Sequence, residues 1–265
     1  MIRYLRIFSL YFQNVFSHRG RPLVYVATYV FNSVLFLTFI QGVFHQTNNL
    51  NNWSLSSVTS YYFLLIIAAA VLMSHPEIPA IRDDIEKGEL AGRLLKPFSY
   101  YWQRFHAEIP VRIFQGIVGA IIFFLLIYLY HAHMDFKLSL ATGLLALIII
   151  MLAYLICFTF KMILAITALW TTEIRGAQEL TDILITIFAG YIVPVNLLPG
   201  ILEKIAYILP FAYIIYYPII AVQGMLATSS LIFVIGIQVV WLVVLGFGFR
   251  FLWRKGIAQY SDFGH

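Results

Sequence analysis

Few residues in this sequence have the types and spacing that chemistry requires. Two histidines and a carboxylate, His131, His133 and Asp135, lie close together, and these are side chains that bind zinc. Residues two apart on a helix point to different faces, however, so this spacing does not aim the three donors at one ion. We therefore interpret them as polar side chains at the end of an apolar segment and predict no metal site.

No other pattern typical of catalysis or cofactor binding is found. The sequence contains no HExxH, GxSxG or Cys–His set, and no GxxxxGK[ST] loop that would hold a nucleotide phosphate. The single cysteine, Cys157, lies inside an apolar run, so an intrachain disulfide cannot form. We predict that the chain has no catalytic residue and binds no cofactor itself. Catalytic groups can be far apart in sequence, so an enzyme stays an alternative.

The charged residues are concentrated in one short segment, "IRDDIEKGELAGRLLKP", residues 81–97. This segment holds eight of the 29 charged side chains of the chain. Three pairs of opposite charge have the i,i+4 spacing that stabilises a helix: Arg82–Glu86, Asp83–Lys87 and Glu89–Arg93. Pro97 ends any helix by residue 96, and Gly88 could divide the segment into two short helices.

A second, less polar stripe runs along the same segment. It consists of small and apolar residues: Ile81, Ile85, Gly88, Gly92 and Leu95. One interpretation is a solvated helix without a partner, as for most charge runs. The other is a docking surface, because small residues let another protein approach closely and a short helix held between two apolar spans passes a push to both.

The composition indicates an integral membrane protein. The 265 residues are 62% hydrophobic and 11% charged, far from the balance of soluble domains. A crossing needs roughly 20 apolar residues in a helix, and six runs approach this length: 23–44, 57–74, 110–130, 138–160, 180–198 and 229–251. We predict an all-α protein with six transmembrane helices, in a single domain over residues 1–265.

The N-terminal residues 1–20 are predicted to form an interfacial helix. Apolar and aromatic side chains share one face of it: Tyr4, Leu5, Phe8, Phe12, Val15 and Phe16. Such a helix lies along a membrane leaflet with its aromatic face in the acyl boundary.

The apolar stretch 199–225 is not expected to cross the membrane as a straight helix. It contains Pro199, Pro210 and Pro218, and the charged pair Glu203–Lys204. Broken backbone at membrane depth is tolerated where protein buries it. We therefore predict a re-entrant or interfacial hairpin before the last span.

The basic residues indicate the orientation. With both termini in the cytoplasm, 15 of the 17 Lys and Arg residues fall on the cytoplasmic side, leaving Lys137 and Lys204 outside. The cytoplasmic loop that contains the charge run covers residues 75–109. The basic excess is thus a topology signal, and we predict no nucleic-acid partner.

Several polar and ionisable residues in or near the spans could have either a role in transport or a purely structural role. Lys161 could lie in a substrate path, but we favour a span that ends near residue 160, with Lys161 reaching the cytoplasmic headgroups. Asp182 lies deepest in an acidic cluster at the start of the fifth predicted span and could line a gate. Asn32, Tyr191 and Asn196 could contact substrate, although bonds between helices are the commoner role of such residues.

Taken together, several features resemble the ABC type-2 permease family. They are the pattern "IEKGEL…LLKP-S", an amphipathic N-terminal helix, six spans, a proline-broken stretch before the last span and the ending "GIAQYS". The resemblance covers essentially the whole chain. It implies that residues 82–95 are a coupling helix docked in a cleft of an ATPase subunit, and that "YIVPVNLLPGILEKIAYILPF", which begins at Tyr191 and includes Pro194, is the external re-entrant segment over the path.

The same resemblance implies the function and the contact residues. The chain would be the permease subunit of an ABC exporter in the cytoplasmic membrane, moving an amphipathic, lipid-linked or hydrophobic substrate. Its partners would be a separate ATPase carrying ATP and Mg²⁺, a second permease subunit and membrane lipids. The implied ATPase contacts are Arg82, Asp83, Glu86, Lys87, Gly88, Glu89, Leu90 and Arg93. A membrane-embedded enzyme acting on lipid intermediates and an ion-coupled carrier stay as alternatives.

The topology makes a direct prediction. Cysteines introduced by Asn49→Cys and Lys87→Cys should react with a membrane-impermeant thiol reagent from opposite sides of the membrane, because residues 45–56 carry no charge and residues 75–109 are rich in Lys and Arg. Labelling of both from the same side would refute the six-span topology.

Overall fold

The computed structural model describes residues 2–17, 20–44, 53–130, 138–171 and 174–260. Across these ranges the chain is helical and contains no β-strand. This confirms the predicted all-α class.

Five helical segments in the described residues are long and apolar enough to cross a membrane. They are α2 (Gly20–Phe44), α3 (Leu55–Leu72) with the helical turns that continue it to Glu86, α6 (Tyr100–Tyr130), α7 (Leu140–Thr167) and α11 (Thr228–Tyr260). They account for five of the six predicted spans, and show the chain to be a multi-pass membrane protein.

The predicted span at 180–198 is wrong as a single helix. The helix there, α8 (Arg175–Phe188), has 14 residues and is therefore about 21 Å long, short of the roughly 30 Å of a bilayer core. It ends because Gly190 takes a φ of 83°, and the chain then passes Pro194 into the single 3₁₀ turn η2 (Val195–Leu197).

Residues 199–225 form a bent pair of helices, as their prolines predict. Helix α9 (Gly200–Ile208) stops before Pro210, and the turn η3 (Phe211–Tyr213) leads into α10 (Tyr216–Val222). The two parts are bent by 70° relative to each other. If this pair counted as one crossing, the described chain would have six.

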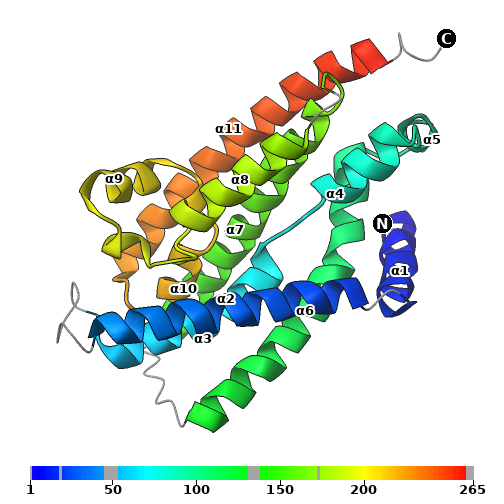
Figure 1. Cartoon of the computed structure of the whole chain (residues 1–265). Helices are drawn as coiled ribbons and strands as arrows, with labels where there is room; N and C mark the ends of the chain where they lie inside the picture. Colours follow the sequence, from blue (N-terminus) through cyan, green and yellow to red (C-terminus); the bar gives the residue numbers. More distant parts are fainter. Residues whose placement is uncertain (1, 18–19, 45–52, 131–137, 172–173, 261–265) are drawn as a thin grey trace.

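Helix α3 lies at the centre of the molecule. Tyr61, Tyr62 and Leu65 are fully buried, and the helix packs against α2, α6, α7 and α10. Helices α7 and α11 run side by side along most of their length (Figure 1). On the outer helices, large apolar side chains such as Phe124 and Phe247 are more than half exposed, as expected of lipid-facing positions.

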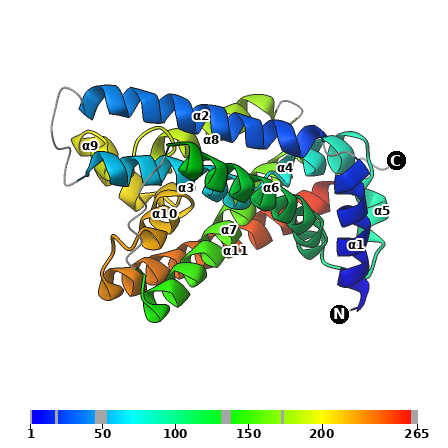
Figure 2. The ribbon, with the colours of Figure 1, turned by 90° about the horizontal axis from the view of Figure 1, so that it is seen from below.

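Different helices lie at the two ends of the molecule. Helix α1 (Ile2–Ser17) packs against α6 and lies at the same end as α5 (Leu90–Leu94) and the C-terminal part of α11. Helix α9 lies at the opposite end (Figures 1 and 2). The helical state of residues 2–17 confirms the predicted N-terminal helix.

Helix α6 contains a proline in its interior. Pro110 has no N–H and leaves one intrahelical hydrogen bond unmade. Arg104 lies before it and Arg112 after it, and both are buried. The helix thus brings two cations to one end of the molecule on either side of a break in its hydrogen bonding.

Candidate functional site

The residues predicted to form a coupling helix belong to a longer charged segment, residues 77–95. It begins with the short turn α4 (Glu77–Pro79), continues as a π-helix, η1 (Ala80–Glu86), and ends with α5. Gly88 joins the last two with a φ of 75°, which L-residues rarely adopt. The predicted division at Gly88 is therefore confirmed.

One buried carboxylate, Asp84, holds the charged segment to α6. It is fully buried and forms ion pairs with Arg93 of α5 and Arg104 of α6, the Nε of Arg104 donating at 2.8 Å. The Tyr100 hydroxyl donates to the same carboxylate at 2.6 Å. Arg104 also donates to the Pro79 carbonyl at 3.3 Å. Because partners this buried must meet in one geometry, the segment has a fixed position on α6.

Arg93 keeps its charge in this cluster. Burial and the neighbouring Arg104 oppose the charged form, but the Asp84 carboxylate and Tyr11 outweigh them and raise the pKa of Arg93.

The opposite side of the charged segment faces outward. Two predicted i,i+4 pairs are present, Lys87–Asp83 at 3.1 Å and Arg93–Glu89 at 3.5 Å. Lys87 and Glu89 are the exposed partners, while Asp83 and Arg93 are partly buried. Pairs at i,i+4 on a helix typically contribute about 0.3–0.5 kcal/mol each, so they add little to the anchor at Asp84. The Arg82 side chain lies outside the described part of the structure.

The predicted ATPase contacts differ in exposure. Glu86, Lys87, Gly88 and Glu89 are exposed on the outer side. Leu90 is not available for contact, because it is 1% exposed and packs in the apolar cluster that includes Tyr100. Leu90 lies on the buried side of α5. The sequence did not indicate this, because the neighbouring residues are charged.

Lys161 is buried and paired, which corrects the prediction that it reaches the headgroups. Helix α7 continues to Thr167, so Lys161 lies inside the helix and is fully buried. Its Nζ donates to Glu77 Oε1 at 3.1 Å and to Asp182 Oδ1 at 2.5 Å. One cation thereby connects α4, α7 and α8. Of the predicted gate residues, Asp182 is the one in this triad.

A third buried ion pair lies within α6, and its two side chains bind the chain that leaves α3. Arg112 Nη2 lies 2.8 Å from Glu108 Oε1, and Arg112 Nη1 donates to the Met73 carbonyl. The His75 backbone N–H donates to the same Glu108 oxygen at 3.0 Å. The chain leaving α3 is therefore bound to α6 before the charged segment begins.

Of the remaining predicted path residues, Tyr191, Pro194 and Asn196 lie within residues 189–198. This stretch is hydrogen-bonded to α3 and to Trp53, two residues before α3 begins. The Tyr61 and Tyr62 hydroxyls each donate at 2.6 Å, to the carbonyls of Gly190 and Ile192. Trp53 Nε1 donates to Asn196 Oδ1 at 3.1 Å.

Two of the predicted path residues are buried, and one of the two lies beside the path residue of α2. Tyr191 and Pro194 are buried, and Tyr191 lies beside Asn32 of α2. These contacts join one part of the chain to another, and a role in a path stays a prediction for Asn32, Tyr191, Pro194 and Asn196.

The histidine-containing cluster of the sequence, His131, His133 and Asp135, lies outside the described residues. Among the residues that the structure describes, no group of three His, Cys, Asp or Glu side chains could hold a metal ion.

Comparison with known proteins identifies the family. The sequence model described as "ABC-2 family transporter protein" matches residues 29–264. The chain belongs to this family. No curated protein and no solved structure matches it. This match confirms the resemblance to the ABC type-2 permeases. The chain is therefore a membrane transport component, and its long apolar helices agree with this.

The anchoring of residues 189–198 predicts a conformational requirement at Gly190. A Cβ there would lie 2.7 Å from the Tyr61 hydroxyl, on a backbone with φ of 83°. Gly190→Ala should destabilise the protein by about 1–3 kcal/mol. Gly236→Ala, in α11 with no atom within 4 Å of the added Cβ, should be neutral or slightly stabilising. Thermal unfolding in detergent measures both, and equal unfolding temperatures would contradict the requirement.

The triad predicts a large cost for losing Lys161. Lys161→Met leaves Glu77 buried without its counter-ion and should destabilise the protein by about 3–5 kcal/mol. The double variant Lys161→Met, Glu77→Gln should recover part of this loss, because the buried charge is gone. Lys204→Met, at an exposed position of α9, is the control. Unfolding of Lys161→Met at the wild-type temperature would show that the triad does not stabilise the fold.

Proposed function

We propose that this chain is the permease subunit of an ATP-driven exporter and that its charged segment docks on a separate ATPase subunit. The observation that carries the proposal is the two-sided construction of this segment. Asp84 fixes its inner side to α6, and its outer side presents Glu86, Lys87 and Glu89. An ABC-2 permease typically works with an ATPase component, and a rigid, charged, exposed segment suits such a contact.

The ion pairs suggest how movement of the ATPase would reach the spans. A displacement of the charged segment acts on α6 through Asp84–Arg104. It acts on α7 and α8 through Glu77, Lys161 and Asp182. Closure of the ATPase on ATP would in this way reposition three helices together and open a path next to them. ATP and Mg²⁺ belong to the partner in this proposal.

The membrane arrangement we propose follows the sequence prediction. The N-terminal helix, the charged segment and the C-terminal end of α11 face the cytoplasm, with α1 along the leaflet, and α9–α10 forms the external re-entrant segment. That α9 lies at the end of the molecule away from α1 and α5 supports this (Figure 1). Glu203 and Lys204 would then avoid the bilayer centre, where each charge costs about 2.5–3.5 kcal/mol.

We further propose an amphipathic, lipid-linked or hydrophobic substrate and a second permease subunit across the path. An ion-coupled carrier, the alternative, needs ionisable groups that exchange their ion or proton during transport. Lys161 and Asp182 instead bind each other at 2.5 Å in this structure. No observation favours a membrane-embedded enzyme.

Two kinds of substitution on the outer side of the segment test the docking proposal: one reverses charge and the other adds a bulky side chain. The double variant Glu86→Lys, Glu89→Lys should reduce retention of the ATPase by at least about tenfold, since about 1.4 kcal/mol corresponds to that factor. Gly92→Trp should also reduce retention of the ATPase, because the large indole side chain would keep the partner from approaching. Gly92 is the suitable position because a Cβ there meets no atom within 4 Å, whereas any side chain at Gly88 strains its backbone.

The measurement is copurification with the tagged permease in its native host. The ATPase is recognised by its GxxxxGK[ST] loop in mass spectrometry, and ATP turnover is assayed on the purified complex. Lys204→Glu, a charge reversal on α9, is the matched control and should retain the ATPase. If both docking variants retain the ATPase fully and hydrolyse ATP at the wild-type rate, the docking proposal is wrong and the segment is a solvated loop.

A further inference from the structure

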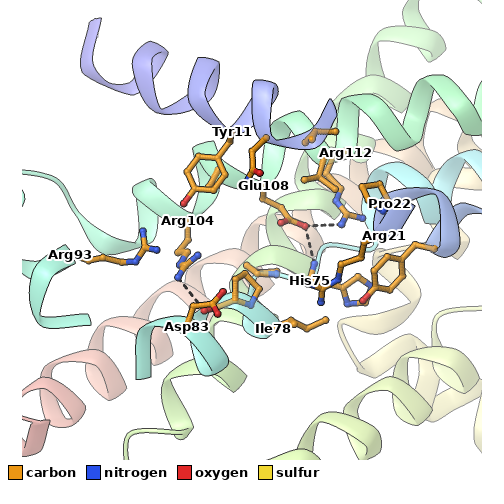
Figure 3. A pocket seen from close by; sticks show the side chains of 17 residues that line it. Tyr11, Arg21, Pro22, His75, Ile78, Asp83, Arg93, Arg104, Glu108 and Arg112 are labelled. Atoms are coloured by element: carbon orange, nitrogen blue, oxygen red, sulfur yellow. Dashed lines mark hydrogen bonds and ion pairs between the residues drawn. The ribbon is translucent and has the colours of Figure 1, made fainter. Parts of the chain in front are cut away.

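A cavity of about 360 Å³ lies between α1, the start of α2, the charged segment and α6. Figure 3 shows that side chains from all four elements line it. Its charged lining consists of four arginines and two carboxylates: Arg21, Arg93, Arg104, Arg112, Asp83 and Glu108. The volume is that of a small ligand site.

The charges around this cavity leave a positive excess. Arg93 and Arg104 share the Asp84 carboxylate, Arg93 also pairs with Glu89, and Arg112 pairs with Glu108. Asp83 is bound by Lys87 from outside the cavity. Arg21, at the start of α2, has no hydrogen bond or ion pair with any residue that the structure describes.

Guanidinium groups that line one cavity suit a phosphate. Their planar forks bind its oxygens in pairs, and a charge-assisted hydrogen bond of this kind is about twice as strong as a neutral one. The buried Arg104 and Arg112 are held in place by their carboxylates, so they need no ordering when an anion arrives. Arg21 is free to turn toward it.

Part of the cavity wall is apolar. Val15, Pro22 and Tyr25 contribute to its wall. Next to the lining residues in the chain, Leu10 of α1 and Val24 of α2 are 63% and 66% exposed. A ligand that combines a phosphate with hydrocarbon would satisfy both the arginines and these side chains.

We propose that this cavity binds the phosphate of an anionic membrane lipid, with Arg21 as a direct contact. The acyl chains would lie along the exposed apolar side chains of α1 and α2. A lipid bound there joins α1 and α2 to the charged segment, so the lipid composition of the membrane would affect how firmly that segment is held. The proposal does not depend on what docks on the segment's outer side.

The test compares lipid binding by the full chain and by two variants. The protein is purified in detergent with added phosphatidylglycerol or phosphatidylcholine, and retained lipid is counted by native mass spectrometry. Wild type should retain phosphatidylglycerol about tenfold better than phosphatidylcholine, and Arg21→Gln should lose most of this preference. Arg21→Gln breaks no ion pair with the part of the chain that the structure describes, and the variant should fold. Arg175→Gln, also an exposed arginine at the start of a helix, should keep the preference.

A second arm separates a lipid from a soluble anion. Phosphatidylglycerol should raise the unfolding temperature of wild type and not of Arg21→Gln, while inorganic phosphate at the same concentration should have no comparable effect. Equal retention of the two lipids, or an undiminished preference in Arg21→Gln, would overturn the site. Equal stabilisation by inorganic phosphate would overturn the lipid as its ligand.

Discussion

The position of the charged segment depends on the buried carboxylate of Asp84. Removing a charge from water is costly unless its partners surround it, so a carboxylate at this depth fixes whatever binds it. Arg93 binds it from within the segment, and Arg104 and Tyr100 bind it from α6. The outer face of the segment and the cavity beside it are placed by these contacts of Asp84.

Two further buried charge clusters join elements far apart in sequence, one through hydrogen bonds to backbone groups and one through side-chain ion pairs. Glu108 and Arg112 hold the end of α3, and Lys161 connects Glu77 with Asp182. Apolar side chains alone allow helices to slide or rotate against each other, because hydrophobic contact has no direction. Buried ion pairs are directional, so we attribute to them the relative placement of helices that the apolar core holds together.

The sequence was informative where the signal is local. Long apolar runs predicted five of the spans, and i,i+4 spacing predicted the Lys87–Asp83 and Arg93–Glu89 pairs. It failed where the partner is distant. Glu77 and Lys161 are 84 residues apart, and nothing in either segment indicates the other. The end of the fifth predicted span was missed because hydropathy continues past Gly190 although its backbone conformation ends the helix.

Pro110 gives α6 a property that neither hydropathy nor ion pairs describe. The hydrogen bond that its missing N–H would have made lies between Arg104, which holds the charged segment, and Arg112, which holds the end of α3. A helix bends most easily where its hydrogen bonding is interrupted. A bend of α6 at Pro110 would let its first turns tilt with the charged segment while the apolar remainder of the helix keeps its contacts.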